Sequence, residues 1–273
     1  MRVIYNTTDI TKEVVDYYSG TKSLTLLSTD ALYFGDRVPF NFLYMKLSGT
    51  AQSATSSLEA SYWDGSNWKD AVEVYDETSV SGKTLAQSGF VTITPDKNYG
   101  WQRESTNDGG ETVTGLTAFN IYDHYWMKFT VDANCSAITV DWIGRKFSDD
   151  NDLGTEFPDL VRTSVKTAIL SGKTNYEEQA IRAYDIIVND LIANNYIHDG
   201  NQVLERDRVK LTSVSKVAEI IYGMLGDDYT DQRLAANKEY VKRLHNCLPK
   251  IDKNNNALID VQENKTSSGS LYR

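Results

Sequence analysis

Hydrophobic and polar residues follow two different periods in the two halves of the chain. Between residues 23 and 144 they alternate within short segments, which is the pattern of β-strands that have one buried face. The segments are 23–27, 31–35, 40–47, 58–62, 71–75, 90–94, 122–131 and 137–144. Seven or eight strands at about this spacing, with loops compatible with a Greek key, favour an antiparallel β-sandwich or jelly roll.

One hairpin gives the clearest local signal in this half. Apolar and polar residues alternate over 58–62, and Asp64 and Gly65 then form a pair typical of tight turns. Trp68 begins the return strand. This segment is therefore predicted to form two neighbouring antiparallel strands.

Three amphipathic helices are predicted between Tyr176 and Leu248. Thr174 and Glu177 have the spacing of a capping box that would open the first helix. Segment 201–210 is a polar connection, Gly226 ends the second helix and Pro249 ends the third. The predicted apolar stripes are Ala180, Ala183, Tyr184, Ile187, Val188, Leu191 and Ile192; then Val214, Val217, Ala218, Ile221, Met224 and Leu225; then Leu234, Val241, Leu244 and Leu248.

These patterns predict an α+β protein of two domains. Residues 1–150 would form the N-terminal β-sandwich and 151–158 an acidic linker. Residues 159–250 would form a small α-helical bundle, and 251–273 a polar loop and an extended C-terminal tail. Composition changes at the same place, because all five tryptophans precede residue 159 and the whole net charge of −10 lies in the first 158 residues.

Composition also makes some classes of function less favoured. An acidic surface disfavours general binding to nucleic acid, because phosphates are bound by Lys and Arg. No run of about 18 apolar residues predicts a transmembrane helix, and no apolar core of a signal peptide is expected. Cys135 and Cys247 fall in different halves and do not form a disulfide framework.

Segment 252–263 has the spacing of an EF-hand calcium loop. Its candidate ligands are the side-chain oxygens of Asp252, Asn254, Asn256, Asp260 and Glu263 and the backbone carbonyl of Leu258. Two features oppose a Ca²⁺ site. Ala257 stands where the sharp turn normally requires glycine, and the residues after Glu263 do not predict an exiting helix. A Ca²⁺ loop and a metal-free polar turn both remain open.

Aromatic residues offer a second candidate surface. Trp63, Trp68 and Trp126 have flat faces on which a sugar ring could stack. Aromatic side chains also fill the core and rim of β-sandwiches, and we favour that interpretation.

No catalytic constellation is found in the sequence. It has no P-loop, no GxGxxG, GxSxG or CxxC motif, and no HExxH motif. The three histidines are far apart, and the acidic residues are too scattered to nominate a glycosidase pair. We therefore expect no enzymatic activity and name no catalytic residue.

The helical half resembles the head–tail adaptor (connector) proteins of tailed bacteriophages. The resemblance rests on the predicted helix 176–195, the polar connection 201–210, the helix pair around Gly226, the loop 254–260 and the closing residues 269–273. Segments 32–44 and 62–68 look like the β-sandwich decorations of phage virion proteins. The long N-terminal sandwich is a departure from the minimal adaptor.

This resemblance implies a structural virion protein made in the host cytoplasm. Such proteins form a homo-oligomeric ring, usually a dodecamer, in the neck between the portal protein and the tail, and DNA passes through without specific contacts. The C-terminal residues Gly269, Ser270, Leu271, Tyr272 and Arg273 would dock on a neighbouring protein by adding a strand to its sheet. The alternatives are a carbohydrate-binding or host-recognition sandwich attached through a helical domain and, less favoured, a hydrolase.

Overall fold

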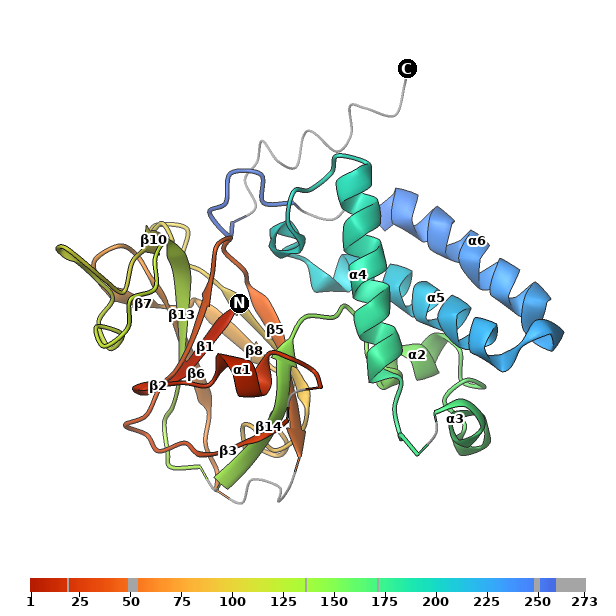
Figure 1. Cartoon of the computed structure of the whole chain (residues 1–273), viewed down its shortest axis with the longest axis horizontal. Coiled ribbons are helices and arrows are strands. Elements are labelled where there is room, and N and C mark those ends of the chain that lie inside the picture. The colour runs from red at the N-terminus through yellow and green to blue at the C-terminus, as the bar shows by residue number, and fades with distance from the viewer. Residues whose placement is uncertain (19, 49–53, 136, 171, 248–250, 259–273) are drawn as a thin grey trace. The chain divides into compact units, whose positions relative to one another are not determined.

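The computed structural model describes residues 1–18, 20–48, 54–135, 137–170, 172–247 and 251–258. The internal contacts of the chain divide it into two compact units. The first comprises Met1–Gly144 together with Asn254–Leu258, and the second contains Arg145–Lys253. The predicted mixed α+β class is confirmed, with antiparallel sheets in the first unit and helices in the second (Figure 1).

Two antiparallel sheets build most of the first unit. The larger has the order β2-β1-β4-β13-β6-β7, and β10 also pairs with β13. Its strands are β1 (Arg2–Tyr5), β2 (Thr8–Asp9), β4 (Leu32–Asp36), β6 (Leu58–Trp63), β7 (Trp68–Asp70), β10 (Arg103–Glu104) and β13 (His124–Val131). The five-stranded sheet has the order β3-β14-β5-β9-β8, formed by β3 (Lys22–Thr25), β5 (Phe42–Ser48), β8 (Glu73–Asp76), β9 (Gly89–Thr94) and β14 (Ala137–Gly144). A short helix α1 (Thr11–Val14) and a hairpin of β11 (Asn107–Asp108) and β12 (Glu111–Thr112) complete the unit.

The predicted hairpin is confirmed at β6 and β7. Trp63 lies opposite Trp68 in the register of the two strands. A carboxylate oxygen of Asp64 accepts hydrogen bonds from the backbone amides of Ser66 at 2.9 Å and Asn67 at 2.7 Å. Gly65 has φ +96°, a conformation that a residue without Cβ adopts most easily.

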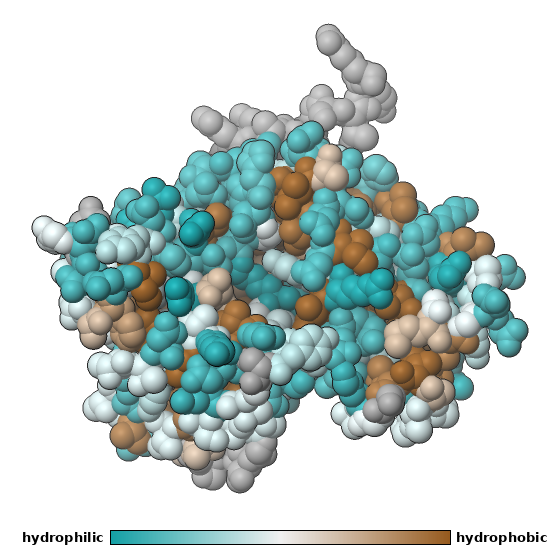
Figure 2. All heavy atoms as spheres, in the orientation of Figure 1, coloured by the Kyte–Doolittle hydropathy of each residue, from teal (hydrophilic) through white to brown (hydrophobic). Residues whose placement is uncertain are grey.

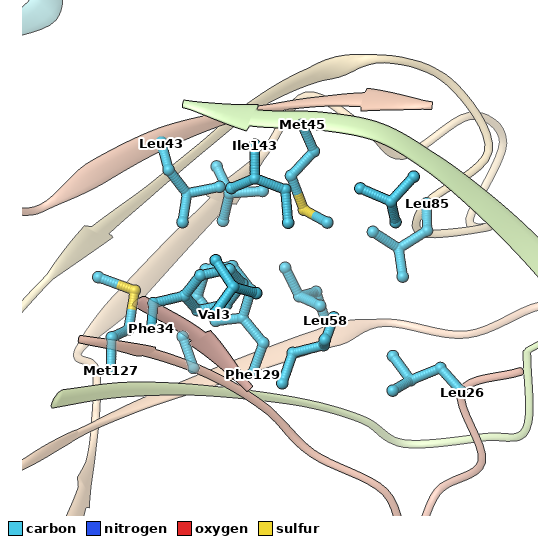
Figure 3. Packing of buried hydrophobic residues seen from close by; sticks show 14 of the residues in the cluster. Val3, Leu26, Phe34, Leu43, Met45, Leu58, Leu85, Met127, Phe129 and Ile143 are labelled. Carbon is cyan, nitrogen blue, oxygen red and sulfur yellow. The ribbon is translucent and has the colours of Figure 1, made fainter. Parts of the chain in front are cut away.

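The two sheets share one hydrophobic core. Figure 3 shows side chains of Leu43 and Ile143, from the five-stranded sheet, pointing toward Phe34 and Phe129 of the larger sheet. The rings of Phe34 and Phe129 have centroids 4.8 Å apart. Burying these apolar surfaces is the main contribution to the stability of this unit.

The opposite face of the larger sheet carries a second cluster. Tyr33, Trp63 and Trp126 alternate along their strands with residues that face the shared core, as the period of two requires. Val113 and Leu116, from the segment after β12, cover these rings. Both faces of the larger sheet are therefore buried.

Helices form the second unit. They are α2 (Asp150–Glu156), α3 (Thr163–Ile169), α4 (Glu177–Ala193), α5 (Arg206–Leu225) and α6 (Thr230–Cys247), with single turns of 3₁₀ helix at Gly200–Gln202 and Asp227–Tyr229. Their hydrophobic cluster includes Ala180 and Ala183 of α4, and Val214, Val217 and Ile221 of α5. None of the helices in the described residues is long and apolar enough to span a bilayer.

The segment expected to be an acidic linker, 151–158, mostly lies in a helix. Asp149 caps α2 by accepting hydrogen bonds from the amides of Asn151 and Asp152, and the Asp152 carboxylate accepts one from the Asp149 amide. This reciprocal capping box and the helix dipole stabilise the acidic residues of the first turn. The acidic run is therefore a helix start, which a count of charges alone does not distinguish from a linker.

The expected capping box of α4 is also corrected. Its N-cap is Tyr176, and no side chain caps it. The Tyr176 amide instead donates to the Asp150 carboxylate at 2.9 Å. Glu177 is buried and pairs with Lys146, so it is not available to Thr174.

Candidate assembly surface

The α5–α6 hairpin carries the feature that bears most directly on assembly. Gly226, with φ +97°, ends α5, and the two helices then pack along their lengths. The predicted stripe of α5 is confirmed at Val214, Val217, Ala218 and Ile221, which are all at least 98% buried. Since α6 packs on α5, the side chains that α6 buries against the unit determine which face of α6 is exposed to solvent.

The face that α6 buries is not the one predicted. Its buried side chains are Ala236 and Tyr240, each 3% exposed. The Tyr240 hydroxyl donates a hydrogen bond to the Asp190 carboxylate of α4, and the Lys216 ammonium of α5 lies 3.8 Å from the centre of the Tyr240 ring. A small side chain permits close approach of α6, and a tyrosine with both its ring and its hydroxyl engaged fixes its rotation.

This rotation turns part of the predicted apolar stripe outward. Leu234 is 58% exposed and Val241 is 44% exposed, while Leu244 is half-buried. Lys238, also exposed, lies one helical turn from each of them. We call Leu234, Lys238 and Val241 the α6 stripe. Figure 2 shows hydrophobic residues reaching the surface over α4 and α6.

Buried polar contacts fix the start of this unit to its helices. The Lys146 ammonium lies 3.2 Å from the Glu177 carboxylate, and their side chains are 2% and 3% exposed. Burial lowers the pKa of Lys146, and the negative charge of Glu177 opposes that change. In the same segment of the chain, the hydroxyl of Ser148 shares a hydrogen bond of 2.7 Å with the hydroxyl of Ser213. Periodicity gave no signal for these contacts.

The polar connection 201–210 is not an extended loop. Asn201 and Gln202 are buried in a 3₁₀ turn, and α5 already begins at Arg206. The Gln202 carboxamide accepts a hydrogen bond from the His198 amide at 2.6 Å and donates one to the Asp252 carbonyl at 2.9 Å. Asn201 and Gln202 are therefore part of the interior of this unit.

Residues of the candidate calcium loop are partly described. Asp252 belongs to the second unit and is fully buried. The carboxamide oxygens of Asn254 and Asn256, in the first unit, accept hydrogen bonds from the amides of Asn256 and Leu258 at 3.2 and 2.8 Å. Ala257 adopts φ +58°, the conformation for which glycine was expected.

The rest of that loop, Asp260 and Glu263, lies outside the described residues. Within the described part of the chain, no group of three His, Cys, Asp or Glu side chains is placed to hold a metal ion. The calcium site stays a prediction that calorimetry with Ca²⁺ can test. Gly269, Ser270, Leu271, Tyr272 and Arg273 also lie outside the described residues.

The proposed aromatic surface is corrected by burial. Trp63 is 2% exposed, Trp126 is fully buried, and Trp68 is half-buried with its indole N–H donating to the Thr114 carbonyl at 2.9 Å. The segment after β12 packs on these rings, as described above. The rings of Trp63 and Trp126 are therefore not available to a sugar, in agreement with their interpretation as core aromatics.

Comparison of the chain with protein-family models, curated proteins and solved structures finds no match.

Proposed function

We propose that the protein is a structural, non-enzymatic component of a tailed-bacteriophage virion, a head–tail adaptor that forms a homo-oligomeric ring between portal and tail. The proposal joins the resemblance of the helical half to one observation, the exposed α6 stripe. Apolar residues in a regular row on one helix face normally pack against another surface. Because the described residues of this unit leave Leu234 and Val241 exposed, a partner protein is the natural counterpart.

In this proposal the two compact units are two domains. The first would be a β-sandwich, supported by two antiparallel sheets that share one hydrophobic core. The second would be the helical domain that builds the ring. The protein would be made in the host cytoplasm and reside in the neck of the virion.

The remaining partners are the portal protein and the tail or neck proteins. The C-terminal residues 269–273 would dock by adding a strand to a sheet edge of a neighbouring protein, where main-chain hydrogen bonds supply affinity. DNA would pass through the ring without specific contacts, because an acidic protein does not neutralise phosphates.

Binding to the portal tests this role. The full chain should bind the portal protein encoded by the same genome, and a chain that lacks residues 265–273 should lose that binding while its circular dichroism and thermal midpoint stay unchanged. A full chain that does not bind the portal would contradict the adaptor role. Normal binding by the truncated chain would contradict only the proposed docking by the tail.

A further inference from the structure

An outward face of α4 has the same spacing as the α6 stripe. Ile181, Asp185, Val188 and Ile192 lie at positions i, i+4, i+7 and i+11 of one helix face, and we call them the α4 stripe. Asp185 is exposed, Ile192 is 38% exposed, and the other two are half-buried. On α6 the same steps give Leu234, Lys238, Val241 and His245.

The two stripes carry opposite charges at the same step. An acidic residue follows the first apolar residue of the α4 stripe by four positions, and a lysine follows the first apolar residue of the α6 stripe by four positions. Neither Asp185 nor Lys238 forms an ion pair with another residue in the described part of the chain. Each stripe therefore combines apolar residues with one charge that forms no ion pair within the described residues.

Within one copy these two faces do not meet. One polar contact between α4 and α6 in the described residues is made by Asp190 and Tyr240. On a helix of 3.6 residues per turn, Asp190 lies well away from Asp185, and Tyr240 well away from Lys238 and Val241. Among the described residues, Ile192 of the α4 stripe and Leu234 and Val241 of the α6 stripe stay exposed and are available for contacts with another molecule.

We infer that the α6 stripe of one copy packs on the α4 stripe of the next, with Lys238 beside Asp185. This inference rests on the proposed function and gives the ring its contact. Pairing a stripe with its own kind would place Lys238 near Lys238, or Asp185 near Asp185, whereas the mixed pairing joins opposite charges. A contact between two different patches of the same chain is heterologous, and repeated copies of it generate a ring or an open filament.

Charge exchange tests this contact. We expect Lys238→Glu and Asp185→Lys each to raise the concentration needed for assembly about tenfold or more in sedimentation velocity, because each places like charges together. The chain that carries both substitutions restores the opposite pair and should assemble within about threefold of the wild-type concentration. Lys97→Glu, an exposed lysine of the first unit, is the matched control and should assemble normally.

The possible outcomes distinguish a failure of this contact from a failure of the proposed function. If the wild-type chain assembles and neither single substitution weakens it, or if the double substitution fails to restore what the single ones lose, the stripe pairing is wrong and another surface builds the ring. If the wild-type chain stays monomeric over the whole concentration range, both the pairing and the ring are contradicted. Unchanged thermal midpoints of the single variants would show that assembly, and not folding, was altered.

Discussion

Lys146 and Glu177 form an ion pair inside the helical unit, with 3.2 Å between the ammonium nitrogen and the carboxylate oxygen. The residues are 31 positions apart, and both side chains are almost fully buried. Burying a charge away from water is unfavourable unless it is paired. The charge of each residue therefore offsets the cost of burying the other. The pair joins the segment after β14 to the first turn of α4.

Removing one partner should therefore be far more harmful than replacing both. We expect Glu177→Ala to lower the free energy of unfolding by about 3–5 kcal/mol, because Lys146 would remain buried without its counter-charge. The double variant Lys146→Met with Glu177→Leu should stay within about 1 kcal/mol of the wild type or exceed it. Urea unfolding followed by circular dichroism measures both. Equal losses in the single and double variants would contradict a compensated buried pair.

Gly35 and Trp126 provide a test of the buried tryptophan. A Cβ on Gly35 would lie 2.6 Å from the Trp126 ring, which leaves no room for it. Gly35→Ala should lower the free energy of unfolding by about 1–3 kcal/mol. Gly223→Ala is the control, since its nearest neighbour would be the Arg233 side chain at 3.6 Å. That change should stabilise α5 by about 0.5–1 kcal/mol. A harmless Gly35→Ala would place Trp126 elsewhere.

The exposure of the α6 stripe predicts that substitutions in it have little effect on the stability of the monomer. Because Leu234 and Val241 are exposed, Leu234→Ser and Val241→Ser should change the free energy of unfolding by no more than about 0.5 kcal/mol at concentrations below assembly. Ala236→Leu, on the buried face of the same helix, should cost about 1–3 kcal/mol through overpacking. Urea unfolding compares the three. A large loss from Leu234→Ser would mean that α6 is rotated differently.

Asp30 should make the stability of the first unit depend on pH in the acid range. Burial acts to raise the pKa of its carboxyl group, but hydrogen bonds from the Leu27 amide, Asn6 and Tyr5 hold that pKa below its ordinary value. The carboxylate form is thus favoured by folding. The stabilisation is fully present above the unfolded pKa of about 3.9 and is lost as the pH falls through the lower folded pKa.

Titration followed by NMR should therefore show Asp30 deprotonating at lower pH than a free aspartate. Asp30→Asn should also flatten the acid side of the curve of stability against pH. Asp108→Asn, at an exposed position of β11, is the control and should leave that curve in place. An Asp30 midpoint at or above the free value would refute the assigned hydrogen bonds.

The elements of the first unit could be predicted because their signals are local. Alternation along 58–62 and the Asp64–Gly65 turn predict a hairpin, and the structure forms it with Trp63 opposite Trp68. The burial of Trp63 and Trp126 depends on a segment about fifty residues from Trp63 and ten from Trp126 along the chain. Local patterns do not reveal which loop covers a sheet.

In the helical unit, the local pattern predicted the helices but not which face of α6 is buried. Hydropathy selected Leu234 and Val241 as the buried face of α6, while the structure buries Ala236 and Tyr240. The choice depends on close packing at an alanine and on contacts of Tyr240 with Asp190 and Lys216, which a hydropathy scale does not weigh. In the same way, the spacing of Thr174 and Glu177 fits a capping box, but the buried Lys146 competes for that carboxylate.

Electron microscopy of the purified full chain, alone and mixed with the portal protein, would reveal the ring itself. We expect closed rings of many copies with a central opening, which stack coaxially on the portal in the mixture. Particles that remain single copies in both samples, at concentrations where sedimentation is also measured, would contradict the ring.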